Sequence, residues 1–467
     1  LAGTVTATGD IDIVLDALNT TVVTISGALN ATDDVTVTTA ADQDITGDGD
    51  ITGDDISITA LGTGAIEIGD ITAAGSAFIG AADGAITTGS VTANANAAST
   101  FAIEVDTDGA VTANGAYTAD SQADLNISID PTNVDINAPF TATGNIDIFA
   151  TNDITVNADM HASLGNIVLR ADDDGSALPN PAGADGTGDL VMSVGTSLTA
   201  PNGTIDVSGE NVTLGRITSG GVLTVTNDVV GDDTGTITLT GDLRGDGGVT
   251  IQTFAGTDLG VDLSGDISIT AIDNLVSLDT TSLDGAFALN IDAGNGAKAN
   301  ITLGTIGATT PVESLTVSSS DADDVGNTLT LNGDITVEQD IAFTHDADAT
   351  LGGDVTITSN DGAVTMQEAV TGTDDNFTVS AESIIVGVIN TAGGEIILNA
   401  ANDLTTGAVT KTGAAAASLK VTSQRWLIED DILVDGAIDA SEVAEIHVTA
   451  AAANVTINGV GINFSAG

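Results

Sequence analysis

The chain has 467 residues and a formal net charge of −60, because 67 Asp and Glu stand against seven Lys and Arg. So few basic side chains exclude nucleic acid and anionic membrane surfaces as partners, since phosphate groups are bound by Lys and Arg. The absence of Cys excludes disulfides and thiolate metal sites. No apolar run approaches the about 20 residues of a spanning helix, so we expect no membrane insertion. The sequence starts at Leu1, with no initiator Met and no signal peptide, so we expect a mature fragment or a portion of a longer precursor.

One short phrase recurs along the chain: Gly, a polar residue, then two apolar residues separated by one further position. It begins at Gly9, Gly144, Gly165, Gly203, Gly235, Gly265, Gly333, Gly353 and Gly394. A turn residue followed by alternation is typical of a short strand after a tight corner. Successive phrases are often roughly 20 residues apart, which is the length of a β-helix turn with two or three strands. We expect Gly and Asn at these corners to adopt positive φ.

The repeats predict an all-β protein, a right-handed parallel β-helix (β-solenoid) with roughly 20-residue coils over residues 1–420. Within it, residues 171–187 lack alternation and predict a surface loop. Residues 421–467 contain Trp426 and a richer apolar run, so we expect a C-terminal continuation or a distinct terminal module. The segment Ile438–Ile446 is the best helical candidate, with one or two turns and Asp439 or Ser441 as its cap.

The sharpest local motif runs from Asp44 to Asp55. Its candidate calcium ligands are Asp44, Thr46, Asp48, Asp50, Thr52 and Asp55. Gly49 stands at the sixth position, where a calcium loop turns sharply. The segment resembles the EF-hand-like loop of dockerin modules, although Thr46 and Asp55 replace the usual Asp or Asn and Glu. The alternative is two successive solenoid corners that fit the pattern by composition. Calcium is therefore the cofactor we expect, if there is one.

Other polar residues give weaker signals. Looser acidic clusters, which are either cation sites or solvated corners, are Asp172–Asp174 with Asp185 and Asp189, Asp232–Asp233, Asp321 with Asp323–Asp324, and Asp374–Asp375. His161, His345 and His447 are scattered and are expected at the surface or at corners. The chain has no nucleophile elbow, and its Gly-rich stretches lack the Lys of a phosphate loop. We therefore predict that the protein is not an enzyme.

The phrases Gly144-Asn145-Ile146 and Gly9-Asp10-Ile11 resemble those of filamentous-haemagglutinin-type proteins, which are secreted β-helices of bacterial surfaces. The resemblance implies an extracellular or cell-surface stalk or fibre that supports adhesion or matrix building. Its terminal coils would expose free strand edges, so we expect end-to-end self-association into a filament. Surface glycans and other matrix proteins are further possible partners. Stacked carboxylates would repel one another, and divalent cations would relieve that repulsion.

The alternative function is a polysaccharide-binding or polysaccharide-degrading β-helix enzyme. Paired carboxylates for hydrolysis are plentiful, so their presence decides nothing. The seven basic residues are spread along the sequence, and one Trp and one Tyr offer little for sugar stacking. A structural or adhesive protein is therefore the function we predict.

Overall fold

A computed structural model gives the fold. It describes residues 1–15, 22–40, 42–94, 101–119, 124–128, 131–171, 188–227, 235–253, 260–272, 274–294, 299–319, 327–345, 348–412, 418–435, 437–448, 455–457 and 462–463. These residues form parallel strands stacked as a β-solenoid of about 16 turns, each of roughly 22 residues. The predicted all-β parallel solenoid is confirmed, while its handedness stays a prediction. We call one turn of the solenoid a coil, and strands at the same position in successive coils a column.

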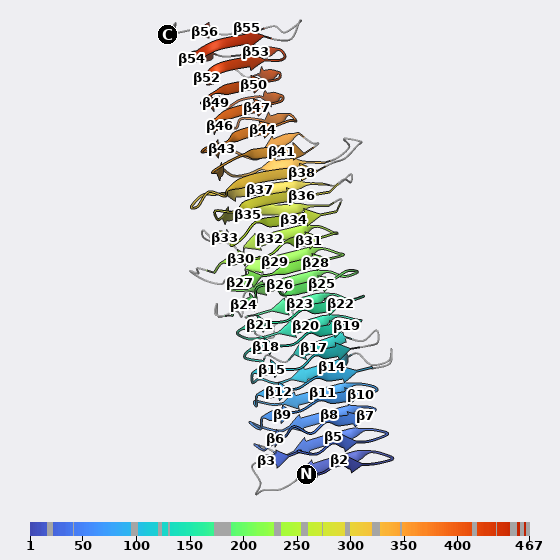
Figure 1. Cartoon of the computed structure of the whole chain (residues 1–467). Helices are drawn as coiled ribbons and strands as arrows, with labels where there is room; N and C mark the ends of the chain where they lie inside the picture. Colours follow the sequence, from blue (N-terminus) through green and yellow to red (C-terminus); the bar gives the residue numbers. More distant parts are fainter. Residues whose placement is uncertain are drawn as a thin grey trace. The chain divides into compact units, whose positions relative to one another are not determined.

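The chain divides into two compact units, which we describe separately. Unit 1 comprises residues 1–241 and 253–257, and its strands form three columns (Figure 1). The first column contains β1 (Val5–Thr6), β4 (Leu29–Asn30), β7 (Ile51–Gly53), β10 (Ile71–Ala73), β13 (Val91–Ala93), β16 (Tyr117–Ala119), β19 (Phe140–Ala142), β22 (Met160–Ala162), β25 (Ser197–Ala200) and β28 (Arg216–Ser219). The second contains β2 (Ile11–Leu15), β5 (Val35–Thr39), β8 (Ile56–Ala60), β11 (Ala77–Ala81), β14 (Phe101–Asp106), β17 (Asp124–Ser128), β20 (Ile146–Phe149), β23 (Ile167–Arg170), β26 (Ile205–Gly209) and β29 (Leu223–Asn227). The third contains β3 (Val22–Thr24), β6 (Asp44–Thr46), β9 (Ile66–Ile68), β12 (Ile86–Thr88), β15 (Val111–Ala113), β18 (Val134–Ile136), β21 (Ile154–Val156), β24 (Leu190–Met192), β27 (Val212–Leu214) and β30 (Ile237–Leu239).

Unit 2 comprises residues 242–252 and 258–467 and also has three columns. The first contains β31 (Leu243–Gly245), β34 (Ile267–Ala271), β36 (Ala288–Asp292), β38 (Ser314–Ser319), β41 (Ile341–His345), β44 (Ala363–Met366), β47 (Ser383–Val386) and β50 (Asp403–Thr406). The second contains β32 (Val249–Thr253), β39 (Leu329–Leu331), β42 (Ala349–Leu351), β45 (Val370–Gly372), β48 (Ile389–Thr391), β51 (Val409–Lys411), β53 (Ile432–Val434) and β55 (Val455–Ile457). The third contains β33 (Gly260–Leu263), β40 (Ile335–Val337), β43 (Val355–Ser359), β46 (Phe377–Ala381), β49 (Ile396–Ala400) and β56 (Ile462–Asn463). Four longer strands each pass through two columns, namely β35 (Val276–Asp284), β37 (Ile301–Ile306), β52 (Ser418–Ile428) and β54 (Ala437–Val448).

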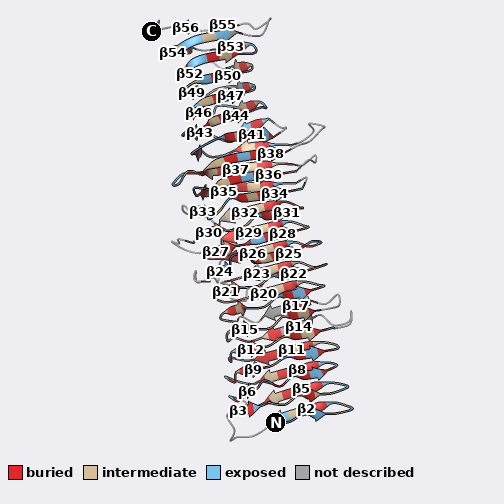
Figure 2. Ribbon diagram, in the orientation of Figure 1, coloured by how far each residue is buried: buried red, intermediate tan, exposed pale blue. Residues whose placement is uncertain are grey.

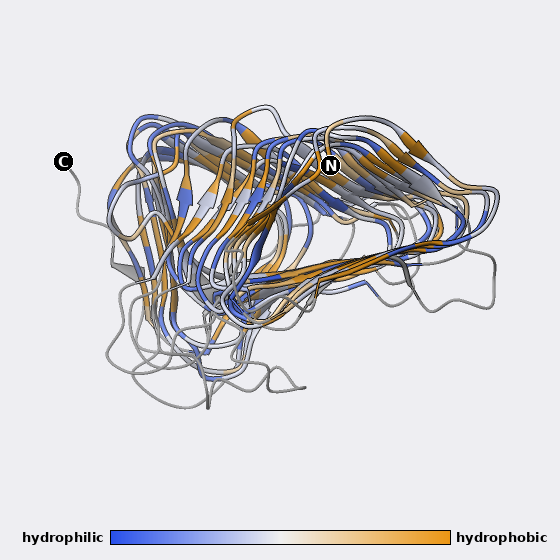
Figure 3. Ribbon diagram, turned by 90° about the horizontal axis from the view of Figure 1, so that it is seen from below, coloured by the Kyte–Doolittle hydropathy of each residue, from blue (hydrophilic) through white to orange (hydrophobic). Residues whose placement is uncertain are grey.

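Alternation along each strand divides its side chains between interior and surface. In β8 the side chains of Ile56, Ile58 and Ala60 are buried, and the residues between them are partly exposed. Buried and exposed positions alternate in this way along both units (Figure 2), and so do apolar and hydrophilic residues (Figure 3). The period of two places every second residue on one face of a strand. One apolar row of each strand therefore lies inside its coil.

Neighbouring coils complete each other because their strands pair in register. Ile71 pairs with Ile51 on one side and with Val91 on the other. The Ile51 amide donates to the Asp70 carbonyl at 2.8 Å, and the Ile71 amide donates to the Ser90 carbonyl at 2.8 Å. Like residues therefore stack on like residues, and the backbone groups of these strands are satisfied by the neighbouring coils.

Interior aromatic residues follow the same register. Tyr117 pairs with Phe140 in the next coil, and their rings stack with centroids 4.5 Å apart and planes 6° apart. The Tyr117 hydroxyl lies 2.6 Å from the Thr88 hydroxyl. Burial raises the pKa of Tyr117 to about 12, so the hydroxyl is neutral at physiological pH. The buried hydroxyl of Tyr117 thus has a hydrogen-bonding partner on a strand of another column.

At several of its positions the Gly of the recurring phrase is required by close stacking. At Gly165 an added Cβ would overlap the backbone of Gly144, and at Gly203 it would overlap the carbonyl group of Gly165. Neither Gly165 nor Gly203 has a positive φ, whereas Gly394 has a φ of 69°. The expectation of positive φ at these corners is therefore wrong for most of them. At Gly165 and Gly203 Gly is required instead because successive corners approach too closely for a side chain. At Gly9, Gly265 and Gly353 an added Cβ would meet nothing within 4 Å.

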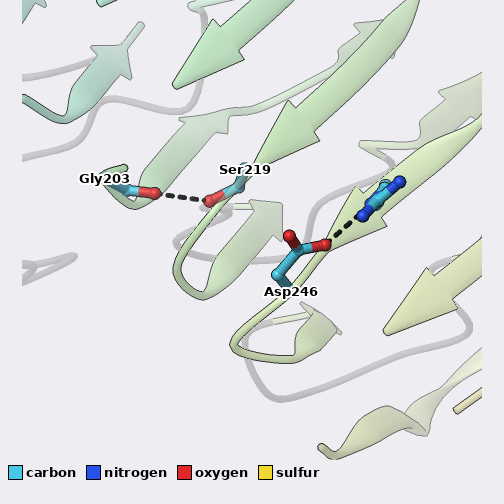
Figure 4. A network of polar contacts seen from close by, with 4 residues as sticks. Gly203, Ser219 and Asp246 are labelled. Carbon is cyan, nitrogen blue, oxygen red and sulfur yellow. Dashed lines mark hydrogen bonds and ion pairs between the residues drawn. The ribbon is translucent and has the colours of Figure 1, made fainter. Parts of the chain in front are cut away.

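Corners also carry side-chain contacts. In unit 1 the Ser219 hydroxyl donates to the Gly203 carbonyl at 2.8 Å (Figure 4). In unit 2 the Arg244 Nε donates to the Asp246 carboxylate at 2.7 Å. The first contact is buried and joins two coils, whereas the second is exposed and contributes little to stability.

The helical prediction for Ile438–Ile446 is wrong, because these residues belong to strand β54. Ile438 pairs with Leu419 and Ile446 pairs with Trp426, so stacking on β52 overrides the weak helical pattern. The columns continue through residue 421, where Val421 pairs with Leu398. The predicted boundary near 421 stays a prediction. Within the described residues, no helix is long and apolar enough to span a bilayer.

Candidate functional site

The predicted calcium segment occupies part of one coil and its corners. Asp44 and Thr46 lie on β6, Thr52 lies on β7, and Asp55 precedes β8. Its remaining candidates, Asp48 and Asp50, lie in the corner between β6 and β7. Among the described residues, no three His, Asp or Glu side chains gather closely enough to hold a metal ion. Calcium binding by this segment therefore stays a prediction.

Two carboxylates of this segment bind the next coil. The Asp44 Oδ1 accepts a hydrogen bond from the Ala65 amide at 2.9 Å. The Asp55 Oδ1 accepts from the Ser76 amide at 2.7 Å. Gly49 lies at a close contact too, because an added Cβ would overlap the carbonyl oxygen of Gly27. Coil stacking thus accounts for the spacing that resembles a calcium loop.

The same contact recurs throughout both units, and we call it the amide ladder. In it, an Asp or Asn side chain just before a strand accepts the amide of the equivalent residue one coil later. In the Gly-Asn-Ile phrases the Asn145 Oδ1 accepts from the Asn166 amide, and the Asn166 Oδ1 accepts from the Thr204 amide, both at 2.8 Å. Other acceptors of this kind are Asp10, Asp34, Asp70, Asp124, Asn133, Asp153, Asp159, Asn211, Asp242, Asp266, Asn300, Asp334, Asp340, Asp354 and Asn376.

The amide ladder explains why Asp and Asn follow the Gly of the phrase. A short side chain with a planar oxygen reaches the amide that the corner leaves without a strand partner. The backbone and side-chain amides of Asn376 hold the pKa of Asp354 below its ordinary value. An ionised Asp is therefore a good acceptor here, and its other oxygen is left for solvent or a second contact.

Coil stacking also gathers charged residues on the outer face of the second column of unit 1. Asp147 on β20 is half-buried and lies one register step from Val168 and two from Asp206. Arg170 on β23 forms an ion pair with Asp206 at 3.1 Å, and its guanidinium carbon lies 5.7 Å from the Phe149 ring centroid. These four side chains, Asp147, Phe149, Arg170 and Asp206, form what we call the β20–β26 cluster.

Asp147 has an unusual proton affinity. Burial and the charge of Asp124 raise its pKa from 3.8 to about 6, while Arg170 lowers it. The cluster therefore holds a carboxyl that is protonated in mild acid, about 10 Å along the stack from the Asp206 side chain that pairs with Arg170. Such a pair is typical of acid–base chemistry, but structural ion pairs also perturb pKa values. This cluster is not apparent in the sequence because its members lie in different coils, and only the register joins them.

A second unusual group is the buried Lys411 on β51. Its side chain has no solvent exposure, and its Nζ has no hydrogen-bond partner among the described residues. Thr391, its register neighbour, is also fully buried, and its Oγ1 likewise has no partner within the described chain. Burial lowers the pKa of Lys411, and the charge of Asp435 opposes that shift. Lys411 thus destabilises its coil whenever it is charged.

The remaining sequence candidates either lie outside the described residues or make separate contacts. Asp172–Asp174, Asp185, Asp232–Asp233, Asp321 and Asp323–Asp324 lie outside the described residues. Asp189 accepts from the Asn211 side chain at 2.8 Å, and Asp375 accepts from the Thr373 amide at 3.3 Å. His345 is buried, with its Nε2 3.0 Å from the Ala299 carbonyl oxygen, so the surface expectation is wrong for it. Its position in β41 points it into the interior.

The comparisons with known proteins give no family for this chain. No family model, no curated protein and no solved structure matches it. The parallel β-solenoid is compatible with the predicted filamentous-haemagglutinin-type resemblance, which stays a prediction.

We expect Asn166→Ala to weaken one step of the amide ladder. It leaves the Thr204 amide without its acceptor, at a cost of about 1 kcal/mol. Hydrogen exchange followed by mass spectrometry should show faster exchange at Thr204 than in the wild type. The matched control Asn166→Asp keeps an acceptor oxygen and should retain protection. Equal protection at Thr204 in the Ala variant would contradict the role of the ladder.

We expect Asp147→Asn to stabilise unit 1 in a pH-dependent way. Because folding raises the pKa of Asp147 from 3.8 to about 6, its ionisation costs stability as pH rises through that window. The thermal midpoints of variant and wild type should differ little near pH 3.5, diverge up to about pH 6 and then stay apart. The separation corresponds to at most about 3 kcal/mol. A constant difference at every pH would refute the assignment.

We expect Lys411→Met to stabilise unit 2 at pH 7 by on the order of 1–4 kcal/mol. The buried amine has a pKa below its ordinary 10.5, so the wild type gains stability as pH rises from the folded pKa toward 10.5. Denaturant unfolding at pH 7 and pH 10.5 should show a larger advantage for the Met variant at pH 7. Lys420→Met, on the partly exposed face of β52, is the control and should change stability little.

Proposed function

We propose that this protein is a non-enzymatic structural or adhesive protein of the extracellular space or cell surface. Its stacked coils would make an elongated rod that associates end to end into a filament or matrix. The observation that supports this is the dependence of each coil on the next for its backbone hydrogen bonds. A structure that grows by adding coils extends without a central core.

The terminal strands supply the surface for association. Within the described residues, β1, β2 and β3 each pair with a single strand, and so do β55 and β56. At the first coil Val5, Val14 and Val22 are 37%, 67% and 45% exposed. An open strand edge with apolar side chains is a template for another parallel strand. We infer that a second copy of this chain occupies it, because its own coils have the matching strand spacing and direction.

Association should depend on Val14, the most exposed of these residues. Val14→Lys places a charge on the open edge without touching the interior, so it should keep the protein monomeric. The control Val194→Lys changes a residue that is 86% exposed in the corner between β24 and β25, and it should associate like the wild type. Light scattering over a concentration series, with electron microscopy of the same samples, measures this. Monodisperse wild-type protein at every concentration would overturn the proposal.

We propose further that divalent cations stabilise the carboxylates of the amide ladder. Asp10, Asp34 and Asp55 occupy the same position in successive coils. The side chain of each accepts a hydrogen bond from the backbone amide of the equivalent residue in the next coil. At the coil spacing of about 5 Å, like charges repel by about 1 kcal/mol even in water. Calcium bridging the remaining oxygens would relieve this.

Calcium should therefore raise the thermal midpoint of the wild type more than NaCl at the same ionic strength. In Asp34→Asn, which keeps the amide acceptor and removes one charge, the calcium increment should be smaller. An equal effect of calcium and NaCl would rule out bridging and leave only screening.

The second candidate function is a polysaccharide-acting enzyme, and one observation favours it. The β20–β26 cluster places Asp147, with a pKa of about 6, near the ionised pair of Arg170 and Asp206. Cleavage of a glycan that is lost in Asp147→Asn would place this function ahead of the structural one.

A further inference from the structure

A groove of about 670 Å³ crosses four successive coils of unit 2. It lies at the corners that join β43 to β44, β46 to β47 and β49 to β50, and it ends at β52. Its lining consists of Ser359, Asn360, Asp361, Ser380, Ala381, Glu382, Asn399, Ala400, Ala401 and Thr422. The groove therefore follows the direction in which the coils stack.

Small side chains make this corner concave. Ala381 and Ala400 pair in register at the ends of β46 and β49, and both are buried. Ser359 ends β43 in the same way, and its hydroxyl accepts the Gly362 amide at 2.9 Å. Ala401 is exposed directly beside them. With methyl groups and a satisfied hydroxyl as its floor, the groove has room for a ligand chain along the stack.

One side of the groove repeats a hydrogen-bonding group in each coil. Ser380, Asn399 and Thr422 pair in register and are each partly exposed. The Asn399 Nδ2 lies 3.4 Å from the Ser380 Oγ, which is a long and weak contact. Ser380 and Asn399 offer both donors and acceptors at the coil spacing of about 5 Å. The Thr422 hydroxyl donates to the Glu442 carboxylate at 3.1 Å and so offers an acceptor.

The other side carries two carboxylates. The Glu382 Oε1 accepts from the Asn402 Nδ2 at 2.9 Å, and Glu382 has no other side-chain partner within the described chain. The Asp361 carboxylate has no side-chain partner there either. One coil before the groove, Glu338 makes the matching contact with the Asn360 Nδ2 at 3.1 Å. The carboxylates in the groove therefore keep oxygens free to accept hydrogen bonds.

The lining selects the chemistry of the ligand. It contains no Lys, Arg or aromatic residue, so phosphates and uronates would meet only repulsion, and flat apolar rings would find no stacking partner. Carboxylates, an amide and hydroxyls are groups that bind alcohols, and hydrogen bonds to carboxylates are the stronger ones. We propose that this groove binds a neutral linear oligosaccharide that lies along the stack of coils.

This binding goes beyond the proposed structural function and does not require self-association. A protein that stays monomeric yet binds the oligosaccharide would refute the filament and leave the groove site standing. A protein that forms filaments without binding any neutral glycan would do the reverse. The two proposals therefore fail separately.

The experiment is titration calorimetry of the full chain with neutral linear gluco-, manno- and xylo-oligosaccharides, with oligogalacturonides as the anionic comparison. Ala401→Trp fills the groove from an exposed position and should weaken binding at least about tenfold. Its control is Ala82→Trp, an exposed Ala in unit 1 whose amide donates to the Ala60 carbonyl as that of Ala401 donates to Ala381. Binding by the Ala82 variant should equal that of the wild type.

A second pair of variants tests the carboxylate. Glu382→Gln keeps the shape and the acceptor for Asn402 but removes the charge, so it should weaken binding about tenfold. Glu67→Gln makes the same change at an exposed position of β9 in unit 1, away from the groove, and should bind normally. The proposal is overturned if no neutral oligosaccharide binds, if uronates bind as well, or if Ala401→Trp binds like the wild type.

Discussion

A coil of this protein cannot satisfy its own backbone, and this constraint governs the rest of the structure. The amides of Ile51 and Ile71 donate to carbonyls about 20 residues further along the sequence, in the neighbouring coil. These hydrogen bonds hold each strand beside the equivalent strand of the neighbouring coil. The strands are therefore in register, and their apolar rows are in contact. Stability is then built from nearest-neighbour interfaces between coils. The last strands at either end are left with one partner among the described residues, which is the physical basis for the proposed association.

The amide ladder ties the extreme charge of the chain to its fold. Asp10, Asp34 and Asp55 each accept an amide from the next coil, and Asn145 and Asn166 do the same without a charge. The phrase therefore needs an oxygen at a fixed place, and both Asp and Asn provide it. Part of the net charge of −60 belongs to these structural acceptors. The repulsion among them is the cost that cations in the medium would relieve.

Residues that depart from the repeat provide chemical groups with roles other than the stacking of coils. Lys411 and His345 are buried polar residues of the interior, and Asp147 is half-buried on the outer face. Small residues at Ala381 and Ala400 form the floor of a groove. A repeat fold tolerates such exceptions because each disturbs only its own coil and the two beside it. This is why candidate binding features can lie on a scaffold whose coils are otherwise alike.

The sequence by itself determined the parallel β-solenoid and its coil length, because Gly followed by alternating residues repeats over most of the chain. It also offered solenoid corners as the alternative to a calcium loop at Asp44 to Asp55, of which residues 47–50 and 54–55 lie at corners. It could not determine which corner residues meet, because insertions change the number of residues from one coil to the next, as between Met160 and Leu198. Only the tertiary structure decided that Asp147 lies near Arg170, that Lys411 points inward, and that residues 438–446 form a strand. The physical reason is that register between coils sets these contacts, and register depends on all the strands that pair at once.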